Sequence, residues 1–106
     1  MELITTDKFE EYVADSSLPV LLDFFAEWCS PCKVLEDVLE SVESEFEGRV
    51  VFYKVNVDSN MDLAKRFEVS ALPTLLLFNS GEVVGKKVGM VSESELKSFI
   101  DIELRK

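Results

Sequence analysis

The sequence predicts an α/β domain in which a central mixed sheet carries helices on both faces. Apolar runs alternate with segments whose apolar residues recur at helical spacing, in the order β-α-β-α-β-α-β-β-α. The run 20–26 is apolar on both alternating faces except at Asp23, which is typical of a central strand covered on both sides. The tight turn Asn79-Ser80-Gly81 lies between the last two strands and predicts an antiparallel hairpin.

The N-terminal part of the chain predicts a strand, a helix and then the central strand. Residues 2–5 are predicted to form a short strand, and Asp7 with Glu10 three residues later predicts a capping box for the following helix. The segment 16–19 is predicted to be the loop that leads into the strand 20–26.

The middle of the chain predicts a long helix from Pro31 to Gly48, because apolar residues recur there at helical spacing. The next strand is predicted over 50–57, and two strands joined by a helix are expected to pair in parallel. Residues 58–60 supply candidate caps for a short helix over 61–67.

The C-terminal part of the chain predicts the hairpin and the last helix. Its strands are expected over 74–78 and 82–88, and Gly89 ends the second one. Ser92 with Glu95 predicts a capping box at the start of the last helix.

Length, composition and charge restrict the class of protein. A chain of this size suits one domain, so residues 1–106 are predicted to fold as a unit. No run approaches the ~18 apolar residues of a membrane span, so we expect a soluble protein. The net charge of −10 argues against nucleic acid and anionic membranes as partners. The N-terminus lacks the basic segment and apolar stretch of a signal peptide, so we expect a cytoplasmic protein. We also expect it to be a monomer.

Both cysteines lie in the stretch Trp28-Cys29-Ser30-Pro31-Cys32, at the predicted start of the long helix. Residues three apart share a helical face, and the free N–H groups of a first helical turn favour a thiolate. Pro31 is compatible with this position, because first-turn residues need no N–H partner. Disulfides in cytoplasmic proteins are usually transient and catalytic, so the spacing predicts redox exchange. The alternative, two cysteines packed as small core residues, fits a pair that flanks Ser-Pro poorly.

Further motifs occur in order across nearly the whole chain. They are Asp23, the segment 26–33, Lys54, Leu72-Pro73-Thr74, Gly81-Glu82-Val83 and Lys87-Val88-Gly89. This ordered set resembles the thioredoxin family. The resemblance implies a central sheet flanked by four helices, a disulfide that cycles between Cys29 and Cys32, and a cis peptide bond before Pro73.

Cys29 is the expected nucleophile, because it is predicted at the exposed mouth of the helix, where unpaired N–H groups stabilise a thiolate. Cys32, a turn deeper, is expected to attack Cys29 and release the reduced target. Asp23 is the candidate base for Cys32, since burial in an apolar strand raises the pKa of a carboxyl group. The resemblance implies this role for Asp23, through a water, with Lys54 nearby. The alternatives are an Asp23 exposed on its strand and a Lys54 that extends along the sheet to reach water.

Three positions differ from the commonest thioredoxin pattern. Ser30 and Ala71 stand where glycine is usual, and Phe25 stands where many members have a second tryptophan. Ser30 has two alternative interpretations: its hydroxyl donates to the Cys29 thiolate and makes the protein more oxidising, or it faces water and caps the helix. We expect Ser30 and Pro31 to tune the redox potential.

Target disulfides lie in extended peptide, so the site needs a flat apolar rim and exposed backbone groups. By position-matching to the family, this rim consists of Trp28, Pro31, Leu72, Pro73, Gly89 and Met90. A cis peptide bond would leave the backbone of Leu72 free to pair with a bound peptide. Core packing is the alternative for Leu72 and Met90, and a lid over the loop is a compatible role for Trp28.

The sequence therefore predicts a general protein-disulfide reductase that acts through a mixed disulfide and helps maintain cytoplasmic redox homeostasis. It would be an electron-carrier protein without resident cofactor or metal, and the resemblance implies a thioredoxin reductase as its external electron donor. A thiol oxidase or isomerase of the same fold would differ in redox potential. A zinc site would require a dimer, since the chain has two cysteines and no histidine. A binding module would keep the fold without redox chemistry.

Overall fold

The computed structural model describes residues 1–106 and contains a five-stranded sheet in the order β1-β3-β2-β4-β5. The strands are β1 (Glu2–Leu3), β2 (Val20–Phe25), β3 (Val51–Asn56), β4 (Thr74–Asn79) and β5 (Glu82–Val88). Strands β1, β3 and β2 run parallel, whereas β4 is antiparallel to β2 and β5 is antiparallel to β4. The expected mixed sheet with a C-terminal hairpin is therefore confirmed.

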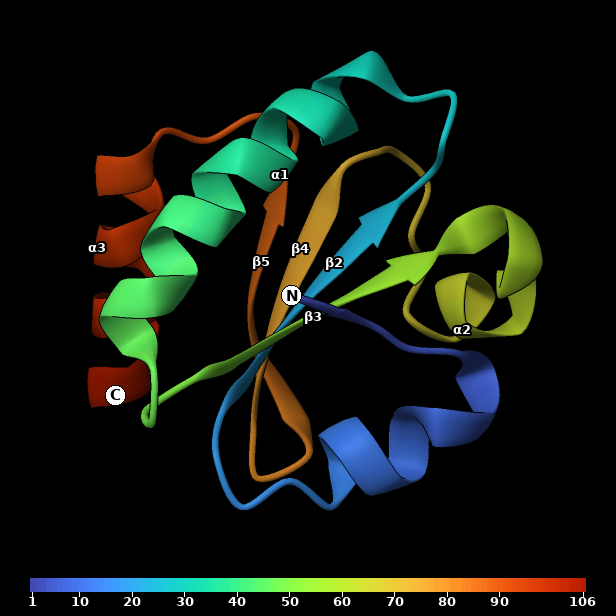
Figure 1. Cartoon of the computed structure of the whole chain (residues 1–106). Coiled ribbons are helices and arrows are strands. Elements are labelled where there is room, and N and C mark those ends of the chain that lie inside the picture. The colour runs from blue at the N-terminus through green and yellow to red at the C-terminus, as the bar shows by residue number, and fades with distance from the viewer.

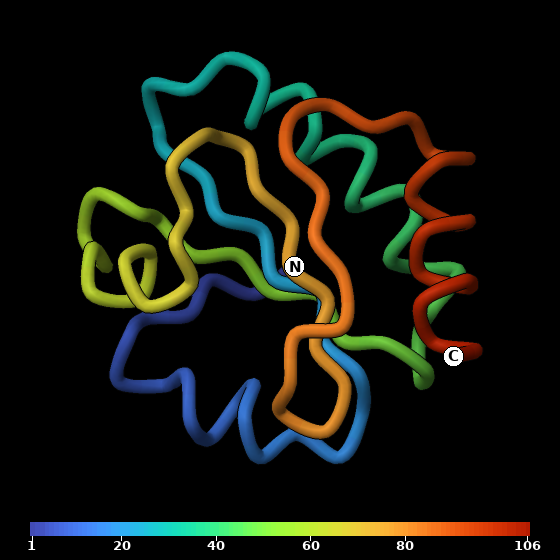
Figure 2. The backbone as a smooth tube through the Cα atoms, turned by 180° about the vertical axis from the view of Figure 1, so that it is seen from behind, coloured from blue at the N-terminus to red at the C-terminus, as the bar shows by residue number.

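Helices cover both faces of this sheet (Figure 1). The regular helices are α1 (Ser30–Glu43), α2 (Met61–Arg66) and α3 (Glu93–Arg105), and an N-terminal helical segment consists of a 3₁₀ turn (Thr6–Lys8) and a π-helical turn (Glu10–Ala14). Helices α1 and α3 lie on one side of the sheet, and α2 lies with the N-terminal helical segment on the other, as the view from behind also shows (Figure 2). No helix is both long enough and apolar enough to cross a membrane.

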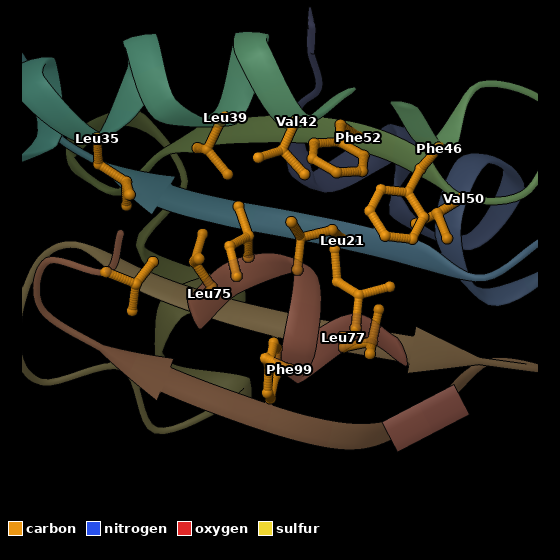
Figure 3. Close-up of a cluster of buried hydrophobic side chains, with 13 residues drawn as sticks. Leu21, Leu35, Leu39, Val42, Phe46, Val50, Phe52, Leu75, Leu77 and Phe99 are labelled. Carbon is orange, nitrogen blue, oxygen red and sulfur yellow. The ribbon is translucent and has the colours of Figure 1, made fainter. Parts of the chain in front are cut away.

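The alternating side chains of the central strand β2 divide the core into two layers. Leu21 packs into a cluster of 13 buried residues beneath α1 and α3, which includes Leu35 and Leu39 of α1 (Figure 3). Leu22 and its alternate neighbours point the other way, into a cluster of 10 buried residues beneath α2 and the N-terminal helical segment. Successive strand residues face opposite sides, so Asp23 lies on the face of Leu21, which α1 covers.

The N-terminal helical segment differs from its prediction, because the Asp7–Glu10 capping box does not form. Neither turn of this segment has a side-chain cap. The Asp7 carboxylate instead accepts a hydrogen bond from the Thr5 hydroxyl, and the Glu10 carboxylate lies 3.0 Å from the Arg66 guanidinium. Both carboxylates interact with other side chains, so the N-terminal helical segment begins without the predicted capping box.

The helices on either side of β3 end and begin differently from the prediction. Helix α1 ends at Glu43, and a separate 3₁₀ turn (Ser44–Phe46) precedes Gly48, whose φ is +83°. Residue Asn60 precedes α2 but makes no cap to it. Its buried side chain accepts hydrogen bonds from the backbone N–H and the hydroxyl of Thr6, so it ties α2 to the N-terminal segment.

Two local predictions for the C-terminal part are confirmed. The hairpin turn places Ser80 and Gly81 at positive φ, and a Cβ on Gly81 would lie 2.8 Å from the Ala14 carbonyl oxygen. At the start of α3, Ser92 and Glu95 form both hydrogen bonds of the predicted capping box.

Candidate active site

The two cysteines lie at the start of α1, just after the loop that follows β2. Cys29 is the N-cap residue of α1 and Cys32 lies in its first turn, with 5.3 Å between the two Cα atoms and a disulfide between the two sulfurs. The Cys29 Sγ accepts a hydrogen bond of 3.3 Å from the Cys32 backbone N–H, which is one of the unpaired donors of the helix start. The N-cap interaction that one interpretation gave to Ser30 is thus made by Cys29.

The cysteine pair is more deeply covered than expected. Cys29 is 4% exposed and Cys32 is 3% exposed, so the prediction of an exposed mouth at Cys29 is wrong for the oxidised form. Both residues form a small apolar cluster with Ala26, against which Phe25 and Leu72 pack. These neighbours come from the end of β2 and from the loop before β4, which the family resemblance had placed at the rim of the site.

Asp23 is a buried carboxyl group behind the cysteine pair. It is 2% exposed, and its Oδ1 atom has no hydrogen-bond partner. Burial, and to a smaller extent the negative charge of Glu36, raise the pKa of Asp23 from 3.8 to about 7, and the positive charge of Lys54 partly opposes this rise. The alternative of an exposed strand residue is therefore wrong.

Lys54 and Glu36 form an ion pair beside Asp23. Lys54 is the β3 residue in register with Asp23 of β2, and its Nζ atom lies 2.5 Å from Oε1 of Glu36 on α1. The same ammonium group lies 5.4 Å from the centre of the Phe25 ring. Lys54 thus extends neither freely into water nor onto Asp23, because Glu36 holds it.

A small cavity joins these groups to the inner cysteine. Its volume is about 140 Å³, and Asp23, Cys32, Glu36 and Lys54 all contribute to its lining. A cavity of this size accommodates water, and the carboxylates and ammonium group supply the polar partners that a bound water needs. The Asp23 carboxyl group and the inner cysteine therefore line one and the same cavity.

The outer rim of the site contains the expected apolar side chains, to different degrees of exposure. Trp28 is 70% exposed, and its Nε1 donates a hydrogen bond of 2.9 Å to the Asp58 carboxylate. Met90 is 45% exposed, so core packing is wrong for this residue. Leu72 is half-buried and packs against two apolar clusters, which makes it part of both core and rim.

The remaining rim residues come from the loops at the same end of the sheet. The Leu72–Pro73 peptide bond is cis, as the resemblance implied, and Pro73 is buried. The Gly89 backbone N–H donates a hydrogen bond of 2.8 Å to the Pro73 carbonyl, which joins the end of β5 to this loop. Pro31 and Ser30 are exposed in the first turn of α1.

Sequence reasoning missed two acidic residues at the site. Glu36 follows Cys32 by four positions, so it lies on the same face of α1, and this spacing is a signal that could have found it. Asp58 comes from the 3₁₀ turn after β3 and meets Trp28 across 30 residues of sequence. No local pattern links Asp58 to Trp28.

A disulfide-bonded cysteine pair at the start of a helix that packs on a mixed sheet, with a buried carboxyl group lining the same cavity as the inner cysteine, is typical of a thiol–disulfide oxidoreductase. Residues 1–102 match the family model of thioredoxin, and the chain belongs to the thioredoxin family. It is 40% identical over 102 residues to a thioredoxin of Buchnera aphidicola subsp. Baizongia pistaciae, covering 96% of this chain and 94% of that protein. It is 45% identical over 98 residues to a thioredoxin of Allochromatium vinosum, covering 92% of each. Family membership indicates disulfide-containing targets and a reductase as its classes of partner.

Proposed function

We propose that this thiol–disulfide oxidoreductase is a general protein-disulfide reductase, in which Cys29 attacks the target and Cys32 releases it. The observation that carries the proposal is the position of the pair, with Cys29 capping α1 and Cys32 one turn deeper beside the cavity of Asp23. A nucleophile at a helix start and a resolving thiol beside a base are the two parts that the reaction needs.

In the first step the Cys29 thiolate attacks one sulfur of the target disulfide. A bond forms between Cys29 and that sulfur, the target's own S–S bond breaks, and the second target sulfur leaves as a thiolate. The free N–H groups at the start of α1 favour the thiolate of Cys29, as the hydrogen bond from the Cys32 backbone N–H to the Cys29 sulfur illustrates.

In the second step Cys32 attacks the Cys29 sulfur of the mixed disulfide. The Cys32 thiol gives its proton to the Asp23 carboxylate through water in the shared cavity, and the Cys29–target bond breaks as the internal disulfide forms. The target leaves with two reduced sulfurs, and the cysteine pair is oxidised by two electrons. The pKa of about 7 supports Asp23 as a base, because a group with this pKa exchanges protons at neutral pH.

Targets are proposed to bind as extended peptide across the rim of Trp28, Pro31, Leu72, Pro73, Gly89 and Met90. The exposed rings and methionine offer apolar contact, and the loop at Leu72 offers backbone groups for strand-like pairing. Ser30 and Pro31 are proposed to tune the redox potential, because they separate the two cysteines in the first turn of α1.

The oxidised pair must receive two electrons before the next cycle, and we propose a thioredoxin reductase as the donor. The two cysteine sulfurs carry these electrons themselves, so the proposal includes no resident cofactor or metal. A cycling dithiol needs a reducing compartment, for which the cytoplasm is our proposal. We further propose that the chain acts as a monomer and as a single thioredoxin domain, which the sheet shared by all five strands supports.

Trapping the mixed disulfide tests this function. With insulin as the disulfide substrate, Cys32→Ser should accumulate a covalent adduct through Cys29, because the releasing thiol has been removed. Cys29→Ser should form no adduct and should lose insulin reduction while keeping its fold by circular dichroism. An adduct that forms equally through Cys32 in the Cys29→Ser variant would contradict the assigned roles. The redox potential separates a reductase from an oxidase or isomerase, which would have a markedly less negative value.

A further inference from the structure

Glu36 lies close to the cysteine pair but has no part in the two proposed reaction steps. It lies one helical turn after Cys32 on α1 and lines the same cavity as Cys32 and Asp23. Its carboxylate is the partner of the Lys54 ammonium group, at 2.5 Å. Glu40, one turn further along α1, is exposed and does not line the cavity.

The ion pair with Glu36 affects Asp23, because Lys54 lies next to Asp23 on the sheet. Lys54 and Asp23 are register partners on adjacent parallel strands, so their side chains emerge on the same face of the sheet. An ammonium group in that position is the natural ion partner for the carboxylate beside it. Its Nζ atom instead bonds Glu36, and the Oδ1 atom of Asp23 has no hydrogen-bond partner.

We propose that Glu36 is a positioning residue for proton transfer at Cys32: by holding the Lys54 ammonium group, it leaves Asp23 without a direct ion partner and so keeps it an effective proton acceptor. This inference rests on the proposed role of Asp23 in the second step of the reaction. Glu36 itself touches neither sulfur in the reaction and acts through Lys54.

The charges around Asp23 support this direction of effect. From β3 Lys54 faces it, from α1 Glu36 and Lys33 line the cavity together with Cys32, and the loop after β2 contributes Glu27. The neighbouring β4 residue in register with Asp23 is the apolar Leu75. Glu36 raises the pKa of Asp23 and Lys54 lowers it, so loss of Glu36 removes one influence and releases the other.

The test is a titration of the Asp23 carboxyl group by NMR in the oxidised protein, where neither cysteine titrates. Glu36→Gln should lower the apparent pKa of Asp23 by on the order of one unit, because Lys54 is then free to approach it. The pH midpoint of target release should move down by the same amount in stopped-flow measurements. An unchanged Asp23 titration in Glu36→Gln would overturn the proposal.

Two further variants separate positioning from a general effect of charge. Glu40→Gln removes the same charge one turn further along α1, outside the cavity, and should leave the Asp23 titration unchanged. In a Lys54→Gln background, Glu36→Gln should lower the pKa of Asp23 by less than half as much as in the native chain. The proposal that Glu36 acts by holding Lys54 would be overturned if Glu36→Gln shifted the pKa of Asp23 equally in both backgrounds. It would also be overturned if Glu40→Gln shifted this pKa as much as Glu36→Gln does.

This titration does not depend on whether the protein reduces disulfides. A failure of the proposed function would appear in the trapping of insulin by Cys32→Ser, whereas a failure of the Glu36 proposal would appear only in the Asp23 titration and the release profile.

Discussion

Replacing Asp23 with asparagine should stabilise the oxidised protein strongly at pH 8 and hardly at all near pH 4. Burial raises the pKa of Asp23 from an ordinary 3.8 to about 7, so the folded protein keeps a proton that the unfolded chain releases. Stability therefore falls as the pH rises from about 4 to about 7, by ~1.4 kcal/mol per unit, and the full loss of about 4 kcal/mol is present above pH 7. Asparagine has a similar shape and cannot ionise.

Urea unfolding of the native protein and Asp23→Asn at pH 4, 6 and 8 measures this directly. The difference between the two proteins cancels the contribution of other titrating groups, and urea leaves electrostatic effects unscreened. The free energy of unfolding of Asp23→Asn should exceed that of the native protein by about 4 kcal/mol at pH 8, and the excess should vanish towards pH 4. A difference that is the same at all three pH values would refute the reasoning.

Three other outcomes follow from the same structure. Asp23→Asn should slow release of the reduced target more than formation of the mixed disulfide, and equal slowing of both steps in rapid-mixing kinetics would contradict its role as base. If the Ser30 hydroxyl supports the Cys29 thiolate, Ser30→Gly should slow alkylation of Cys29 at neutral pH, and an unchanged rate would remove that idea. Leu39→Ala should lower the free energy of unfolding by about 2–5 kcal/mol, since Leu39 is fully buried between α1 and the sheet; a loss under about 1 kcal/mol would contradict that packing.

Strong periodic patterns and local capping motifs predicted most of the fold. The apolar run of β2, the helical spacing of α1 and the Ser92–Glu95 box each depend on neighbours within a few residues. The hairpin turn at Ser80 and Gly81 is equally local, since it depends on backbone conformations that few residues adopt.

The errors fall where a side chain finds a partner from a distant part of the chain. Asp7 and Glu10 have the spacing of a capping box, but Glu10 pairs with Arg66 across 56 residues of sequence. Asn60 looks like a cap for α2, yet its amide oxygen binds Thr6. A sequence pattern ranks local partners, whereas the folded chain brings in competitors that the pattern does not contain.

The candidate site divides in the same way. The cysteine spacing predicted redox exchange, and the family resemblance implied the disulfide between Cys29 and Cys32. The single carboxylate in an otherwise apolar strand predicted the burial of Asp23. Part of the apolar cover over Cys29 comes from Leu72, more than 40 residues further along the chain, so local sequence patterns did not predict the low exposure of Cys29. The pairing of Lys54 with Glu36 needs both the strand register and the helix face, and only the structure supplies these together.

Alkylation of the reduced protein, followed cysteine by cysteine by mass spectrometry at neutral pH, tests the assigned chemistry most directly. The position of Cys29 at the start of α1 predicts that its sulfur reacts many times faster than that of Cys32, and that mild oxidation yields one intramolecular bridge. Slow and equal labelling of the two sulfurs, with no internal bridge after oxidation, would contradict it.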